Sequence, residues 1–266
     1  MISKKGINRL AIVVVIGVIV LAVCGVWFSM SVQASADDAE RLDLEAFSQS
    51  ATIEANDKPV LVTELDFLVQ ELSTEDMIKK SHLVIKGELT EISPAAWVDT
   101  ENGGNSIYTN YVFRVKETYR GEVKDEVVLS QEGGQVGNRR TVCCGSPEFE
   151  LGKEYVLYLY RPMPGYGLVT DDDYYWLVGY NQGVFAVEET AGTMMAVAED
   201  GGEKTSLQTL AQEIEALDQE YPVNYNWEYE EMMENMKANL ESGFITKEES
   251  EEILAKLQQY PERVEE

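Results

Sequence analysis

Two adjacent cysteines are the residues in this sequence whose type and spacing most suggest chemistry. Cys143 and Cys144 are neighbours in the chain, so their Cα atoms lie about 3.8 Å apart, below the roughly 4.4–6.8 Å of ordinary disulfides. Three states stay open: a strained vicinal disulfide, a bridge to another chain, or two free thiols. A thiol nucleophile needs a basic partner. The single histidine, His82, lies far upstream beside an apolar segment, and we expect it to be structural.

A pair of arginines is the second feature that could bind a ligand. Arg139 and Arg140 follow residues 133–138, a glycine-containing segment in an otherwise acidic chain. This segment lacks the Gly-Lys-Ser/Thr ending that a phosphate-binding loop requires. The alternative to a ligand contact is a solvated loop whose arginines pair with nearby carboxylates.

An acidic triplet stands before an aromatic run, residues 174–176. Its carboxylates could contact a cation, and the aromatic rings could stack on a sugar ring. The spacing differs from the D-x-D-x-D-G pattern of a calcium loop, so an acidic surface turn ahead of a buried strand is the alternative. The triplet consists of Asp171, Asp172 and Asp173.

The charge balance excludes one class of partner. The chain has 48 Asp and Glu against 21 Lys and Arg, a net charge of −27, which opposes binding to nucleic acid. One histidine and three cysteines are too few for most metal sites and histidine-based catalytic sites. We therefore predict no catalytic residue, no cofactor and no metal site, and the sequence favours a protein that is not an enzyme.

The N-terminus has the pattern of a membrane anchor. The basic segment 1–9 precedes the uncharged run 10–32, which as a helix would be about 34 Å long at about 1.5 Å per residue. The basic segment should stay in the cytoplasm. This predicts a single-pass protein of the cell membrane, held there through residues 10–32, with most of the chain extracytoplasmic. Cleavage after Ala36 and lipidation at Cys24 are the two alternatives.

Three regions follow: an acidic spacer, 33–72, a β-rich domain, 73–200, and an acidic helical region, 205–266. Ser73 and Asp76 predict a capped helix over 74–80. Runs rich in Val, Tyr and Phe then predict strands, so the fold class is mainly β with α. These runs are residues 83–89, 108–119, 126–130, 153–160, 174–187 and 194–199.

The helical region divides into one helix and a hairpin. Apolar residues spaced 3, 4 and 3 apart predict a helix that packs on the sheet; they are Leu207, Leu210, Ile214 and Leu217. In the hairpin, a methionine-rich face ends near Gly243, and Thr246 with Glu249 forms a capping box for the second helix. Methionine suits an adaptable contact surface, so we predict a protein partner at this hairpin. Its apolar face comprises Met232, Met233, Met236 and Leu240.

Four phrases in order resemble the OB-like β-barrel of the tissue-inhibitor-of-metalloproteinases and netrin group, and of many bacterial exported proteins. They are 83–89 (LVIKGEL), 112–121 (VFRVKETYRG), Cys144-Gly145 and 149–158 (FELGKEYVLY). The resemblance implies a small antiparallel barrel with an interior of Phe113, Val115, Phe149, Leu157 and Phe185. The N-terminal Cys-x-Cys of the animal inhibitors is absent, so protease inhibition is not implied. The tail, 240–254, resembles a short bacterial C-terminal helical hairpin.

Taken together, the sequence favours a membrane-anchored binding or scaffolding protein that acts without catalysis and whose ligand it does not name. One alternative is a cell-surface hydrolase or thiol-redox protein that uses Cys143 and Cys144. Another is a structural subunit of a membrane complex.

Overall fold

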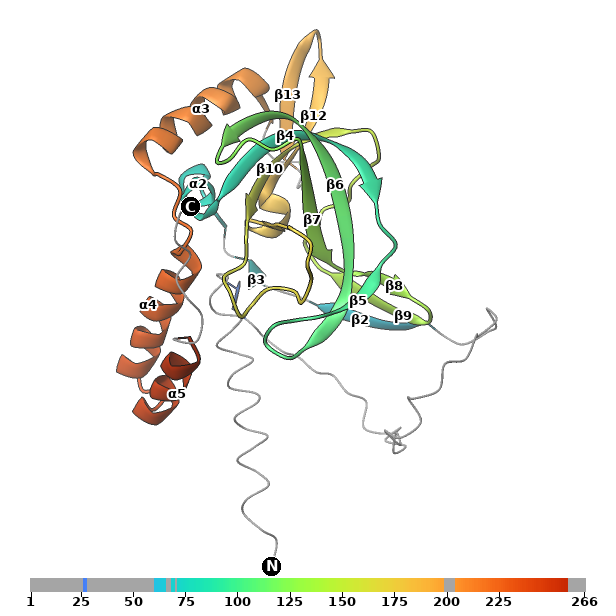
Figure 1. Cartoon of the computed structure of the whole chain (residues 1–266). Coiled ribbons are helices and arrows are strands. Elements are labelled where there is room, and N and C mark those ends of the chain that lie inside the picture. Colours follow the sequence, from blue (N-terminus) through green and yellow to red (C-terminus); the bar gives the residue numbers. More distant parts are fainter. Residues whose placement is uncertain (1–25, 28–59, 66–67, 70, 199–203, 258–266) are drawn as a thin grey trace, which may run out of the picture.

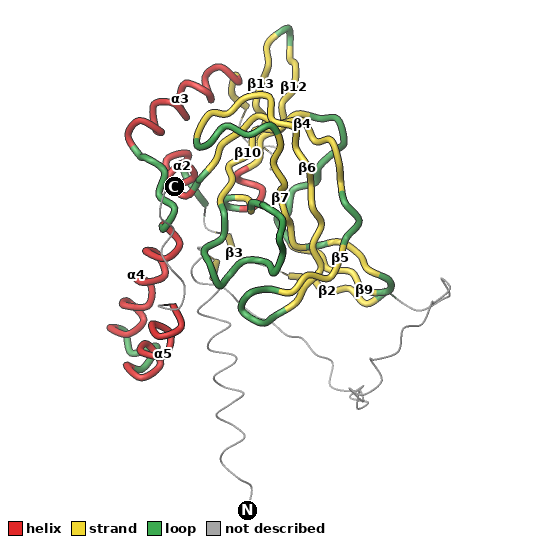
Figure 2. The backbone as a smooth tube through the Cα atoms, in the orientation of Figure 1, coloured by secondary structure: helices red, strands yellow, loops and turns green. Residues whose placement is uncertain are grey.

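The computed structural model describes residues 26–27, 60–65, 68–69, 71–198 and 204–257 (Figure 1). The described chain is mainly β, with helices along one side of the largest sheet (Figure 2). The predicted class, mainly β with α, is therefore correct at this level, whereas two of its details, the closed barrel and the N-terminal spanning helix, are wrong.

The main sheet runs in the order β14-β13-β12-β10-β4-β6-β5, with β11 paired to β10 and β7 paired to β6. The predicted strand segments lie within it as longer or shorter strands, except that the run 174–187 is divided into β11, a 3-10 turn over 180–183 and β12. The strands are β4 (Leu83–Ile92), β5 (Ala96–Asp99), β6 (Asn105–Arg120), β7 (Glu126–Glu132), β10 (Glu154–Tyr160), β11 (Trp176–Leu177), β12 (Val184–Thr190), β13 (Thr193–Ala198) and β14 (Lys204–Ser206).

Strand β10 is buried on both faces, which gives the fold two cores. Its residues alternate between them, as the period of two in a strand requires: Leu157 belongs to one core and Tyr158 to the other. Phe113 and Phe149 share the core of Leu157, with Val115 packed against it. Phe185, predicted in the same interior, instead lies in the core of Tyr158 beside the helices.

The sheet is open, so the predicted closed OB-like barrel is wrong. Its end strands, β14 and β5, do not pair with each other. Within the described chain the only backbone pairing between β7 and the residues around β11 is an isolated bridge, Leu129↔Tyr175, rather than a ladder. The preceding segment, 161–175, contains Pro162 and Pro164; proline has no backbone N–H to donate, and β11 is only two residues long.

The predicted caps lie at the start of α2, the end of α4 and the start of α5. Helix α2 (Thr74–Lys80) has the Ser73–Asp76 capping box, and α3 (Leu207–Glu220) buries Leu210 and Ile214 against the sheet. Helix α4 (Trp227–Glu241) is followed by Gly243 at φ 74°, a backbone angle that favours glycine. Helix α5 (Lys247–Leu257) starts at the Thr246–Glu249 box.

A smaller sheet of β2 (Leu61–Leu65), β9 (Arg139–Cys143) and β8 (Gly134–Val136) lies near β5 (Figure 1). Strand β2 runs parallel to β9, from Leu61↔Arg139 to Leu65↔Cys143. Residues 61–65 fall in the segment predicted to be a spacer. None of their side chains is buried, and Leu61 and Val62 stay about half exposed, so the strand exists through its backbone pairing with β9.

The N-terminal prediction needs the largest correction. Val26–Trp27 form strand β1, which pairs antiparallel with β3 (Leu68–Val69), and residues in a strand cannot belong to a continuous helix over 10–32. The other residues of that run, with Cys24 and Ala36, lie outside the described residues. No helix of the described chain is long and apolar enough to cross a membrane. The predicted spanning helix over 10–32 is therefore wrong, and so is the single-pass cell-membrane location that was based on it.

Candidate functional site

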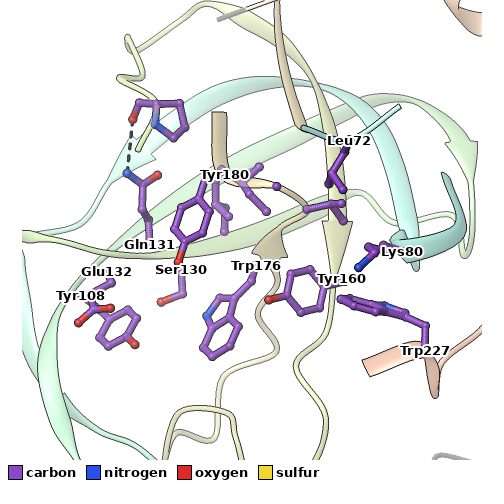
Figure 3. Close-up of a pocket in the computed structure, with 15 residues that line it drawn as sticks. Leu72, Lys80, Tyr108, Ser130, Gln131, Glu132, Tyr160, Trp176, Tyr180 and Trp227 are labelled. Carbon is purple, nitrogen blue, oxygen red and sulfur yellow. Dashed lines mark hydrogen bonds between the residues drawn. The ribbon is translucent and has the colours of Figure 1, made fainter. Parts of the chain in front are cut away.

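A small cavity between β7, β10, β11 and the first turn of α4 is the candidate site. Its volume is about 120 Å³, and we call it the aromatic pocket (Figure 3). Several lining side chains are half-buried, so the cavity meets solvent. It is lined by Leu72, Lys80, Tyr108, Leu129, Ser130, Gln131, Glu132, Pro147, Tyr160, Trp176, Leu177, Val178, Gly179, Tyr180 and Trp227.

Three aromatic rings form a continuous row along the pocket. Tyr160 and Trp176 are directly opposite each other in the β10–β11 pair, with ring centroids 6.1 Å apart. Trp227, the first residue of α4, packs on the other side of Tyr160 at 5.3 Å. Both contacts are edge-on, a favoured arrangement of aromatic rings. The row therefore joins the sheet to α4.

The turn η2 (Tyr180–Gly183) and the residue before it contribute Gly179 and Tyr180 to the wall of the pocket. Gly179 at φ 64° precedes it, and a Cβ there would lie 2.8 Å from Leu72 Cδ1, so only glycine fits without a shift. Tyr180 itself has φ 57°, which is uncommon for a bulky residue. The backbone N–H of Asn181 donates to the Gly145 carbonyl at 3.1 Å. Such strain persists where the surroundings enforce it, and it concentrates at functional sites.

Four residues of this lining each carry a buried polar atom that has no hydrogen-bond partner among the described residues: Ser130 Oγ, Gln131 Oε1, Trp176 Nε1 and Trp227 Nε1. Ser130 and Trp227 are nine-tenths or more buried, at 3% and 9% exposure. Gln131 Nε2 donates to the Pro147 carbonyl at 3.4 Å, which leaves its oxygen as the acceptor. Buried polar atoms are normally hydrogen-bonded, so four exceptions in one cavity require an explanation.

The two ends of the pocket carry opposite charges. At one end Ser106 donates a hydrogen bond to Glu132, and burial raises the pKa of Glu132 despite that bond. Burial, reinforced by the charge of Glu132, also raises the pKa of Tyr108. At the other end Lys80 Nζ lies 4.7 Å from the centroid of Trp227 and 2.6 Å from Glu231 Oε2. Figure 3 shows Trp176 and Tyr160 between these ends.

The predicted cysteine pair lies outside this lining. Both thiols are free; Cys143 is buried and Cys144 is exposed. Burial raises the pKa of Cys143 to about 12, and Glu132 and Cys144 act in the same direction. A thiol with so high a pKa is protonated at neutral pH and is a poor nucleophile.

The structure does not bring the predicted charged residues together. Arg139 and Arg140 are exposed on β9. In the acidic triplet, Asp171 and Asp172 are exposed. Asp173 instead pairs with Arg161 at 2.7 Å and with Lys124 at 3.0 Å. Within the described residues no cluster of His, Cys, Asp or Glu could hold a metal ion.

His82 is held by backbone groups on both ring nitrogens. The Arg161 N–H donates to Nδ1 at 3.0 Å, so Nδ1 is an acceptor and Nε2 carries the proton. Nε2 lies 3.2 Å from the Asn224 carbonyl, to which it donates, and the ring of Tyr225 stacks on His82 with centroids 4.9 Å apart. These contacts join the start of β4 to the segment ahead of α4, which agrees with a structural role.

The methionine face of the hairpin packs largely inside the chain. Met232 is buried with Met163, and Met236 with Ile245. Leu240 and Phe244 keep 38% and 66% of their area exposed. The predicted protein partner at the hairpin stays a prediction.

Comparisons with models of known protein families and with curated proteins find no match for this chain. The resemblance to the OB-like group stays a prediction as well, and the case for function depends on the pocket.

Sequence reasoning did not predict this pocket. Trp176 belongs to the run considered for sugar stacking, but the acidic triplet predicted beside it, Asp171–Asp173, lies outside the lining. The polar residues 130–132 were missed. They are the last residues of an ordinary strand, and no spacing in the sequence shows that they face two distant tryptophans.

Proposed function

We propose that this protein binds a small ligand in the aromatic pocket and acts without catalysis. The observation that carries the proposal is that four residues of one aromatic cavity each carry a buried polar atom without a hydrogen-bond partner among the described residues. Ligand sites are typically apolar and aromatic with a few placed polar groups. A cavity of about 150 Å³ can hold benzene, so a volume of about 120 Å³ encloses part of one ring, and the rest of a ligand extends into solvent.

The thiol-redox or hydrolase alternative has weaker support. It requires an ionised thiol, whereas the pKa of Cys143 is raised to about 12. It also requires a base, whereas His82 uses both ring nitrogens on backbone groups. The groups that act on the pKa of Cys143 are Glu132, Cys144 and Ser146, none of which is basic.

The test is saturation-transfer NMR with a panel of single-ring and small compounds: phenol, indole, methyl glucoside, methyl galactoside, myo-inositol and choline. We expect at least one of them to bind the full chain, and binding to be lost in Trp176→Ala. Trp97→Ala is the matched control, because Trp97 is 47% exposed and lies outside the pocket lining.

Trp176→Leu replaces Trp176→Ala if the alanine variant does not fold. Absence of binding by every compound would refute the proposal. So would binding that survives both Trp176 variants.

A further inference from the structure

We infer that the ligand of the aromatic pocket is a neutral hydroxylated ring, that is, a sugar ring or a cyclic polyol. This inference rests on the proposed function and names the chemistry of its ligand. It follows from what the four unpartnered atoms can donate and accept, and from the charges already satisfied around them.

The unpartnered atoms require a ligand that is both donor and acceptor. The indole nitrogens of Trp176 and Trp227 only donate, the Gln131 oxygen only accepts, and the Ser130 hydroxyl does either. The lining residues that carry these atoms therefore need both a donor and an acceptor from what binds in the pocket. A hydroxyl group supplies both functions, and a ring with several hydroxyls presents them in several directions.

The aromatic row supplies the apolar part of such a site. The C–H face of a hydroxylated ring is apolar and gains by leaving water to pack on an aromatic surface. Trp176 stands between Ser130 and Tyr160 in Figure 3, so one ring on Trp176 has polar groups at its rim. Glu132 at the end of the lining adds a carboxyl group that accepts from a hydroxyl.

A quaternary ammonium ligand fits these observations less well. Aromatic rings and a carboxylate attract such cations, but an ammonium without N–H groups offers nothing to the two indole donors or to the Gln131 oxygen. Moreover, the Lys80 ammonium already lies over the Trp227 ring at 4.7 Å. A second cation beside it would be repelled.

Anionic and purely apolar ligands fit less well too. An anion would meet Glu132 in a chain of net charge −27, and the cation in the lining, Lys80, is already paired with Glu231 at 2.6 Å. An apolar ring would leave the four polar atoms without a hydrogen-bond partner, and a buried polar group without a partner is costly. A neutral hydroxylated ring avoids both costs.

The experiment measures the affinity of the full chain for methyl glucoside, methyl galactoside and myo-inositol, with phenol and choline as comparison probes. The variants are Trp176→Phe and Trp227→Phe, which keep an aromatic ring and remove the indole N–H, with Trp97→Phe as the matched control. We expect at least one hydroxylated ring to bind. Each pocket variant should weaken that binding about 3–10-fold, as the loss of one neutral hydrogen bond predicts, and Trp97→Phe should leave it unchanged.

The outcomes separate the two proposals. If phenol or choline binds in a Trp176-dependent way and neither the methyl glycosides nor myo-inositol binds, the inference is overturned and the binding function stands. Hydroxylated-ring binding that neither Trp→Phe variant weakens also overturns the inference. If no probe binds, as when only water occupies the cavity, both proposals fail.

Discussion

Arg120 provides the sharpest test of how the fold positions the pocket. Its side chain is fully buried at the end of β6. Nε donates to the Ser81 carbonyl at 3.0 Å, and Nη1 donates to the Tyr221 carbonyl at 2.7 Å and to Asp218. Arg120 thus fixes the end of α2 and the end of α3. The chain reaches Trp227 and the pocket six residues after Tyr221.

Replacing Arg120 by methionine keeps an apolar stem and removes these donors. A buried carbonyl left without a partner costs about 1–3 kcal/mol, and removing one partner of a buried ion pair costs about 3–5 kcal/mol. Asp218 keeps 38% of its side-chain area exposed and regains water. The variant also removes Nη2, a buried nitrogen that has no hydrogen-bond partner among the described residues, and this removal offsets part of the loss. We expect a net loss of about 3 kcal/mol in the free energy of unfolding.

The measurement is urea denaturation at neutral pH, with Arg114→Met as the matched control. Arg114 is 57% exposed and pairs with Glu88, so its loss should change stability far less. Arg120→Met should also weaken ligand binding in the aromatic pocket. Equal stability changes in the two variants would refute the role assigned to Arg120.

Three further predictions test the core, the buried carboxyl and the thiols. The Phe149 ring packs edge-on or tilted against Tyr111, Phe113 and Tyr155 with centroids 5.0–5.4 Å apart, so Phe149→Ala should lower the free energy of unfolding by about 3–5 kcal/mol; an unchanged urea midpoint would contradict this placement. Burial raises the pKa of Glu132 above 4.5, so its ionisation costs stability above the folded pKa and that cost disappears as the pH falls towards 4.5. Urea titrations should therefore show Glu132→Gln more stable than wild type at neutral pH, with a gap that closes in acid, and a gap independent of pH would count against the shift. Iodoacetamide at pH 8 followed by peptide mapping should label the exposed thiol of the cysteine pair and spare the buried one without loss of ligand binding; loss on labelling would revive the thiol alternative.

Local signals were enough to predict the α-helices and the longer strands of the main sheet, but not β1, β2, β3, β5, β8, β9 or β14. The Ser73–Asp76 and Thr246–Glu249 boxes satisfy backbone donors within one turn, so their effect is visible in four consecutive residues. The stripe of α3 follows a period that the sequence displays directly. Such features depend on near neighbours in the chain.

The arrangement of the strands depends on contacts that no short segment contains. Phe185 and Leu157 were both predicted to lie in one interior, yet they lie in different cores because β10 is covered on both faces. The apolar run 10–32 has the composition of a spanning helix, but Val26–Trp27 pair with β3, more than forty residues later. The pocket likewise joins Ser130, Trp176 and Trp227 from three distant segments.

The most direct test of the central claim observes the indole N–H groups themselves. The chain has four tryptophans, so a ¹H–¹⁵N correlation spectrum of the full chain shows few indole signals, which the Trp→Phe variants assign. On titration with methyl glucoside, methyl galactoside and myo-inositol, at least one compound should shift the indole signals of Trp176 and Trp227, because each N–H gains an acceptor, and leave that of Trp97 in place. Unchanged Trp176 and Trp227 signals at saturating concentrations of all three compounds, or equal shifts at Trp97, would contradict a hydroxylated ligand bound in the aromatic pocket.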